Sequence, residues 1–361
     1  MKKEFPPLKR SPAIVGYWED KNFIIEEYVS HQKLKASSDV IYLLSLFDTE
    51  TAIDPREILY SKITEFKGES FENTIEEFIK LGFLIPDDKQ TEDKYKKLKD
   101  WHWGEPARHY FFSTKDCYGA LANESKEEYV KSVILTSPQP PLRKSYPGCK
   151  LVPLSKPAKL PGNFHETLLE RRSVRSYSSK PIGMETLASL LFYTWGEQGK
   201  LKSKFFGNLL CKTSASGGAR QPIEGYLLAF NIEGLPAGAY HYNTEKHALE
   251  EIALGDFREM AATNCADQVW VKDAAACFIM TAVIERTSWK YRHPRGLRGI
   301  FLDAGHVSQT LYLVAQSLSL GSCFILALLE EPFEKLLHLD GISESVVGVT
   351  TVGMPSSEYS T

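Results

Sequence analysis

Three short segments of this 361-residue chain combine residue types that could bind a ligand or move a proton. The first, 171–176, holds three arginines and two serines within six residues (RRSVRS). Guanidinium and hydroxyl groups at this density can hold a phosphate through charge-assisted hydrogen bonds. A solvated basic helix end has the same composition, so this segment alone leaves both interpretations open.

The second segment, 214–222, reads SASGGARQP and is rich in small residues. Its glycines permit positive φ angles, and its backbone N–H groups can approach a planar or anionic ligand closely. A tight turn in front of a strand would have a similar composition. The segment is therefore a candidate ligand loop or simply a turn.

The third segment begins with Lys290 and Tyr291, and Arg292, Arg295 and Arg298 follow. A lysine beside a tyrosine offers a base and an acid if burial or the neighbouring arginines lower the lysine pKa by about 3 units from about 10.4. A charged surface loop is the alternative. We expect a helix over 303–319, with Asp303 at its N-terminus and His306 on its first turn.

The elements that must position these segments alternate between helix and strand after residue 163. Helices are predicted over 164–172, 184–197 and 303–319. Strands are predicted over 224–232, 239–242, 275–284 and 346–352, which are rich in β-branched and aromatic residues. The pattern predicts a mixed α/β structure for this half of the chain.

The first hundred residues predict a separate, smaller module. Three amphipathic helices within 38–80 and a strand at 83–85, after Gly82, form the outline of a winged helix. Residues 1–100 carry 16 Lys/Arg and 20 Asp/Glu, a net charge of −4, which is the wrong sign for contacts with DNA phosphates. Peptide binding on an edge strand suits this charge better.

Prolines mark the boundary between the two parts, because seven of the 19 fall between 138 and 161. Such a segment favours extended structure. We therefore expect a winged-helix-like module over 1–100, a proline-rich connector over 101–162 and a second domain over 163–361.

Composition excludes several other classes. The net charge of −3 argues against general binding to nucleic acid or anionic lipid, and the six scattered cysteines form no C-x-x-C pair. Dispersed histidines argue against a metal site. The longest largely apolar run, 274–284, is shorter than the ~20 residues of a membrane span, and no signal peptide is evident, so a cytoplasmic location is expected.

Taken in order, these segments resemble those of a known family. RRSVRSY, SASGGARQPIEGYLLAF, GLPAGAYHYNTEKHALEEI, the KYRHPRGLRG…AGH segment and VVGVTTVGMP are similar to motifs of SagB-type dehydrogenases, the FMN-dependent members of the nitroreductase superfamily that oxidise azoline rings in ribosomal peptides. The resemblance covers residues 164–355. The N-terminal part resembles, more loosely, the PqqD-like modules that bind leader peptides in such pathways.

This resemblance implies a role for each matching residue. The FMN phosphate and ribityl chain would be held by Arg171, Arg172, Ser173 and Arg175, and the flavin would be covered by Ser216, Gly217, Gly218 and Ala219 from the partner subunit of an entwined dimer. Gly321 and Ser322 would approach the isoalloxazine edge near N5, with Gly353 at the C-terminal part of the phosphate site. Lys290 and Tyr291 would be catalytic. Relatives commonly place a basic residue after the last glycine, whereas Met354 follows it here.

The implied fold is α+β, with an antiparallel-rich central sheet flanked by helices. The implied function is the oxidation of thiazoline or oxazoline rings to azoles with dioxygen as the final acceptor, on a peptide or carrier-bound substrate, alongside a cyclodehydratase partner and as a homodimer. Two alternatives stay open: an NAD(P)H-dependent reductase of nitro, quinone or dehydroamino-acid substrates, and a non-catalytic flavoprotein that delivers peptide to a cyclodehydratase.

Overall fold

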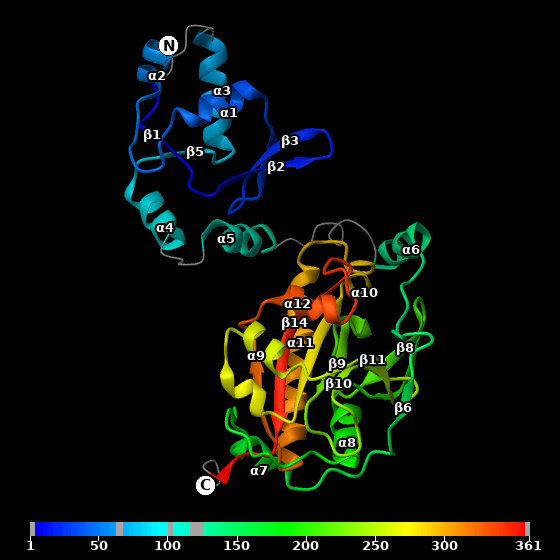
Figure 1. The fold of residues 1–361 in the computed structure, drawn as a ribbon. Helices are drawn as coiled ribbons and strands as arrows, with labels where there is room; N and C mark the ends of the chain where they lie inside the picture. The colour runs from blue at the N-terminus through cyan, green and yellow to red at the C-terminus, as the bar shows by residue number, and fades with distance from the viewer. Residues whose placement is uncertain (1–3, 63–67, 100–103, 116–125, 358–361) are drawn as a thin grey trace. The chain divides into compact units, whose positions relative to one another are not determined.

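A computed structural model describes residues 4–62, 68–99, 104–115 and 126–357. The chain separates into two compact units, 1–117 and 118–361 (Figure 1). The division between the two units falls within the expected connector over 101–162.

The first unit contains two small sheets and five helices among its described residues. In chain order they are β1 (Leu8–Arg10), β2 (Ile14–Glu19), β3 (Asn22–Glu27), β4 (Gln32–Lys35), α1 (Ser38–Ser45), α2 (Pro55–Lys62), α3 (Gly68–Lys80), β5 (Leu84–Pro86), α4 (Lys89–Lys99) and α5 (Gly104–Ser113). The three predicted helices and the following strand are present as α1, α2, α3 and β5. The antiparallel β2–β3–β4 sheet was not predicted.

A buried core and a buried carboxylate hold the first unit together. The core consists of apolar side chains from α1 and α3, including Leu43 and Phe78, packed with Phe47, Leu8 and Phe83. Glu27 on β3 is fully buried, and its carboxylate accepts hydrogen bonds from the hydroxyl groups of Ser11, Ser30 and Tyr95. Because Tyr95 lies on α4, this carboxylate attaches that helix to the β2–β3–β4 sheet.

The second unit is built on one seven-stranded sheet, ordered β13-β14-β12-β9-β10-β11-β6, in which every neighbouring pair is antiparallel. Its strands are β6 (Leu151–Pro153), β9 (Ile223–Ala229), β10 (Gly238–Asn243), β11 (Ala248–Leu254), β12 (Ala276–Val283), β13 (Gly321–Ile325) and β14 (Glu344–Gly353). The proline-rich segment supplies only the edge strand β6, where a missing N–H does not interrupt the sheet. The α+β expectation is confirmed for this unit.

Helices cover both faces of this sheet. The helices of the unit are α6 (Lys126–Thr136), α7 (Phe164–Glu170), α8 (Met184–Trp195), α9 (Arg258–Asn264), α10 (Ile284–Ser288), α11 (Gly296–Ser317) and α12 (Glu330–Leu336), and a separate hairpin is formed by β7 (Glu197–Ser203) and β8 (Gly207–Lys212). Helices α8 and α11 pack with Phe278 and Met280 on one face, whereas α9 and α12 pack with Cys277 and Ile279 on the other. This alternation along β12 is the two-residue period of a strand buried on both faces.

Helix α11 begins earlier than the sequence indicates. It starts at Gly296 rather than Asp303, because the apolar positions Ile300, Ala304 and Val307 already face the core while glycines at 296 and 299 weaken the helical signal. Asp303 and His306 therefore lie in its middle, and the prediction that they occupy the first turn was wrong. No described helix has the length and apolar character needed to cross a membrane.

Close packing at Gly225 on β9 gives a test of this core. A Cβ atom at Gly225 would lie 2.8 Å from the ring of Trp195, which is buried and stacked on Phe278. We expect Gly225→Ala to lower the free energy of unfolding of the second unit by about 1–3 kcal/mol through overpacking. Urea denaturation measures this, with Gly299→Ala as the control because nothing lies within 4 Å of that position. Equal loss in both variants would contradict the packing argument.

Candidate functional site

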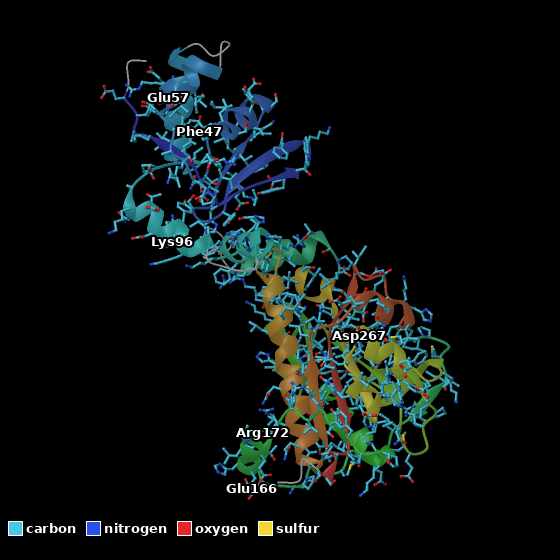
Figure 2. The ribbon with its side chains drawn as sticks, turned by 60° about the vertical axis from the view of Figure 1, so that its left-hand side comes forward. Phe47, Glu57, Lys96, Glu166, Arg172 and Asp267 are labelled. Carbon is cyan, nitrogen blue, oxygen red and sulfur yellow. The ribbon has the colours of Figure 1, made fainter. Side chains whose placement is uncertain are left out.

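The arginine cluster, defined here as Arg171, Arg172, Ser173 and Arg175, follows α7 and lies beside β13. Ser173 forms a bridge with Ser322, and the N–H of the next residue donates a 2.9 Å hydrogen bond to the Ser322 carbonyl. A Cβ atom at Gly321 would lie 2.7 Å from Val174, so only glycine fits this close approach. Figure 2 labels Arg172 and Glu166, both at the α7 end of the second unit.

The guanidinium groups of this cluster have no acidic partner among the described residues. Arg171 lies 5.2 Å from the ring centroid of Tyr312, and Arg175 lies 6.0 Å from that of Trp270. Arg172 donates to two backbone carbonyls at 2.8 Å. Three cations without a counter-charge, next to the Ser173 hydroxyl, are suited to an anion.

Gly353 joins this cluster at the end of β14. It is paired with Gly321 on β13, and a Cβ atom at Gly353 would lie 2.7 Å from the ring of Tyr177. The carbonyl of Met354 accepts a hydrogen bond from the Ser178 N–H at 2.8 Å. The residues predicted for the phosphate and ribityl chain, 171–173, 175 and 353, therefore lie beside 321 and 322, which were predicted at the flavin edge near N5.

The glycine loop, residues 214–222, is held by a buried carboxylate on α11. Asp303 accepts a 2.6 Å hydrogen bond from the Ser216 hydroxyl and a 3.0 Å bond from the Gly217 N–H. Gly218 and Ala219 both have positive φ angles, 62° and 54°. Asp303 thus positions the loop instead of capping a helix.

Lys290 and Tyr291 lie directly against this loop. A Cβ atom at Gly218 would lie 2.6 Å from Lys290 Nζ and would also collide with the Tyr291 hydroxyl. The Lys290 carbonyl accepts a 2.8 Å hydrogen bond from the Tyr129 hydroxyl on α6, and burial raises the pKa of the Tyr291 hydroxyl. The two segments singled out separately in the sequence therefore form one cluster.

Sequence reasoning missed two residues of this second cluster, Phe206 and Trp289, and gave no role to Arg220, although Arg220 lies in the segment singled out above. Lys290 Nζ lies 4.6 Å from the ring centroid of Phe206, and the Arg220 guanidinium lies over both aromatic rings, at 5.2 Å from Phe206 and 5.7 Å from Trp289. Phe206 comes from the tip of the β7–β8 hairpin. A sequence with FF in an otherwise basic stretch gives no local signal of this contact.

The two clusters lie at opposite ends of the sheet. In the register of β12 with β14, Ala276 is opposite Val352 and Val283 is opposite Glu344. The arginine cluster and Gly353 lie at the end marked by Ala276. The glycine loop precedes β9 and Lys290 follows β12, so both lie at the end marked by Val283. Eight residues of strand put about 23 Å between these ends, and Figure 1 shows α7 and α10 correspondingly far apart.

A buried ion-pair network lies next to the second cluster and connects the glycine loop to neighbouring segments. Arg286 on α10 contacts the Glu224 carboxylate at 2.5 Å and donates to the carbonyls of Gln221 and Pro141, each at 2.9 Å. It therefore ties the glycine loop to the proline-rich segment. His241 lies between Glu224 and Glu250, at 3.3 and 2.8 Å.

This network predicts a pH-dependent stability. Burial alone would lower the His241 pKa, but hydrogen bonds to Glu224 and Glu250 outweigh it, and the pKa is raised above its usual 6.5. The stability from the bound proton is complete below about pH 6.5 and is lost as the pH rises through the folded-state pKa. Between pH 6 and 9, the urea midpoint of the wild type should fall more than that of His241→Gln. Parallel changes in both proteins would contradict this assignment.

Comparison with known proteins identifies the family of the second unit. The Nitroreductase family model matches residues 168–354. MJ1384 of Methanocaldococcus jannaschii, a protein named for the nitroreductases, is 31% identical over 179 residues, which are 49% of this chain and 84% of that protein.

Two further similar proteins are not named as nitroreductases. The trifolitoxin-processing protein TfxB of Rhizobium leguminosarum bv. trifolii is 31% identical over 175 residues, 47% of this chain and 47% of TfxB, so the match spans just under half of that protein. A structure of the E. coli microcin synthetase McbBCD complex matches 52% of this chain and 70% of its own at 23% identity and a TM-score of 0.45. On the family model and the MJ1384 match, this chain belongs to the nitroreductase family.

Proposed function

We propose that this protein is an FMN-dependent dehydrogenase that oxidises the azoline rings of a peptide or carrier-bound substrate to azoles, using dioxygen as the final electron acceptor. The observation that carries the proposal is the contact of Lys290 and Tyr291 with Gly218 of the glycine loop. Family membership supports a flavin-dependent oxidoreductase. The name of TfxB, a trifolitoxin-processing protein, supports a role in natural-product modification.

The residues present fit FMN at two places. The arginine cluster offers three guanidinium groups without acidic partners in the described chain, which suits a phosphate. The glycine loop offers small residues with positive φ angles, which suit a planar ring at close approach. FMN, when bound, accepts two electrons as a hydride and passes them to dioxygen.

A complete site requires two copies of the chain. In FMN a ribityl chain of five carbons joins the phosphate to the ring, and this chain is shorter than the strands of about 23 Å at whose opposite ends the two clusters lie. We therefore assign the arginine cluster to one copy and the glycine loop with Lys290 to its partner. The apolar residues Phe301 and Leu302 on α11, which are 54% and 65% exposed in the single chain, suit the surface of a second copy.

In the proposed reaction, the azoline ring loses a proton and a hydride from adjacent carbons. Lys290 Nζ takes the proton, so its ammonium form has to be destabilised when substrate is bound. The Arg220 cation, which contacts the same Phe206 ring as Lys290 Nζ, favours this through like-charge repulsion. Tyr291, whose pKa is raised by burial, stays protonated and orients the substrate or the lysine through its hydroxyl. Tyr129 fixes the backbone at Lys290 from α6.

For the first unit we propose a winged-helix-like, peptide-binding role. Its acidic character argues against DNA. The β2–β3–β4 sheet has an edge strand on each side among the described residues, which suits the addition of a peptide strand. A cavity of about 280 Å³ in the same unit is bounded by Asp87, Asp88 and Glu92. The partner enzyme in this proposal is a cyclodehydratase, which forms the azoline rings that this protein would oxidise.

A reductase is the second candidate, because nitroreductase-family membership is equally compatible with reduction by NAD(P)H. Mixing the purified yellow protein with NADPH under anaerobic conditions separates the two. Rapid bleaching of the flavin with no oxidation of a supplied azoline peptide would support the reductase and contradict the dehydrogenase. Tight peptide binding without either reaction would support a non-catalytic delivery role.

Gly218 tests the fit of the glycine loop to FMN. Gly218→Ala combines a strained φ angle with a collision against Lys290 and Tyr291, so the loop must shift. We expect the FMN dissociation constant, measured by flavin fluorescence, to rise about tenfold or more. The control is Gly207→Ala, which has a similar φ angle and nothing within 4 Å. Unchanged FMN affinity in Gly218→Ala would contradict the assignment of this loop.

The catalytic pair is tested by mass spectrometry of an azoline peptide, which loses two hydrogens on oxidation. Lys290→Met should reduce this oxidation by about 100-fold or more, since a general base contributes 10²–10⁴-fold. Tyr291→Phe should reduce it less, because it removes only the hydroxyl. Both variants should keep FMN bound, which their absorbance spectra verify. Full activity in both, with FMN bound, would refute the roles of Lys290 and Tyr291.

A further inference from the structure

Arg220, in the glycine loop, is buried to an unusual degree for an arginine. Its side chain is 1% exposed, and its guanidinium lies beside the rings of Phe206 and Trp289, which contact each other. Its Nε donates a 3.2 Å hydrogen bond to the Gly218 carbonyl. Its Nη2 is buried and has no hydrogen-bond partner among the residues that the structure describes.

Arg286 shows how the same chain satisfies a buried guanidinium. It has a carboxylate partner, Glu224, and two backbone carbonyls. Asp303 on α11, the acid that holds Arg220's loop, is instead hydrogen-bonded to Ser216 and Gly217. Burial lowers the pKa of Arg220, with a partial compensation from Tyr291. A buried donor without a partner is costly, so an absent acceptor is the natural explanation.

We propose that Arg220 is a ligand-binding residue whose Nη2 donates to a carbonyl or carboxylate oxygen of the molecule that binds against the glycine loop. The inference deepens the proposed function and rests on it for the identity of that molecule. The oxygen comes either from the pyrimidine ring of FMN or from the acyl group of the substrate. Both are planar acceptors that suit a guanidinium beside two aromatic rings.

The ring of Phe206 covers the Arg220 guanidinium. It belongs to the β7–β8 hairpin, which is a sheet of two strands only, so no hydrogen bond of the seven-stranded sheet has to break when Phe206 moves. Its ring also lies under Lys290 Nζ. Displacement of this one ring therefore opens a path to both Arg220 and Lys290.

The test compares Arg220→Met with the wild type, titrating FMN and, separately, benzoate as a planar carboxylate probe. Affinities are measured by flavin fluorescence for FMN and by calorimetry for benzoate. We expect Arg220→Met to weaken at least one of them by about tenfold or more, since a hydrogen bond to a charged group is lost. The matched control is Arg258→Met, which removes an arginine stacked on Phe230 but bonded to Asp256. It should leave both affinities unchanged.

The thermal stability of the ligand-free protein provides a second readout. If Nη2 has a hydrogen-bond acceptor only when the ligand is bound, Arg220→Met removes an unsatisfied buried donor from the ligand-free protein. The melting temperature of the ligand-free variant should then be equal to or higher than that of the wild type. Unchanged affinity for both FMN and benzoate in Arg220→Met overturns the inference, whatever the melting temperature does. Lower affinity together with a higher melting temperature supports it most strongly.

The two ligands also separate the possible sources of the oxygen. Weaker FMN binding assigns the acceptor to the flavin, and weaker benzoate binding alone assigns it to the substrate. A wild type that does not bind FMN would contradict the proposed function, and the benzoate titration would then decide the role of Arg220 by itself. A wild type that binds neither ligand overturns both.

Discussion

The carboxylate of Asp303 is the point on which the second cluster depends. It is buried on the long helix α11, and it fixes the glycine loop through the Ser216 hydroxyl and the Gly217 N–H. Helix α11 packs against the central sheet through Ile300, Ala304 and Val307, so Asp303 attaches the loop to the packed core. Gly218 is thereby kept at the distance from Lys290 that only a residue without a side chain tolerates.

A second constraint acts from the other side of the loop. Arg286 joins Glu224, the Gln221 carbonyl and the Pro141 carbonyl, so one buried guanidinium connects β9, the loop and the proline-rich segment. Four residues later in the chain comes Lys290. Breaking a buried ion pair by removing one partner costs several kcal/mol, and such a loss would reach the loop and the lysine together. The proline-rich segment is thus part of the support of the site.

Local patterns predicted much of the second unit and less of the first. Helix α8 and strands β9, β10, β12 and β14 were predicted within a few residues, since their apolar periods reflect burial directly. The β2–β3–β4 sheet was missed because its strands are short and mix charged with aromatic residues. The start of α11 was misplaced because Gly296 and Gly299 weaken the helical signal. The role of Asp303 was therefore also predicted wrongly.

The site was predictable as a set of segments but not as a geometry. The resemblance assigned 171–175 and the glycine loop to different subunits, but only the strand register shows that the two segments lie at opposite ends of the sheet within one chain. Arg220 and Phe206 have no local signature, because their contact joins a hairpin tip to a loop through tertiary packing. Long-range contacts of this kind are set by the whole fold.

The central claim is that each complete site combines the arginine cluster of one copy with the glycine loop of another. Co-expression of two differently tagged chains, one carrying Arg175→Glu and the other Gly218→Val, tests it most directly. Each variant alone should bind FMN poorly. The purified mixed dimer should regain one intact site, seen as FMN bound at about half of the wild-type amount. A mixed dimer that binds no more FMN than either variant alone would contradict the claim.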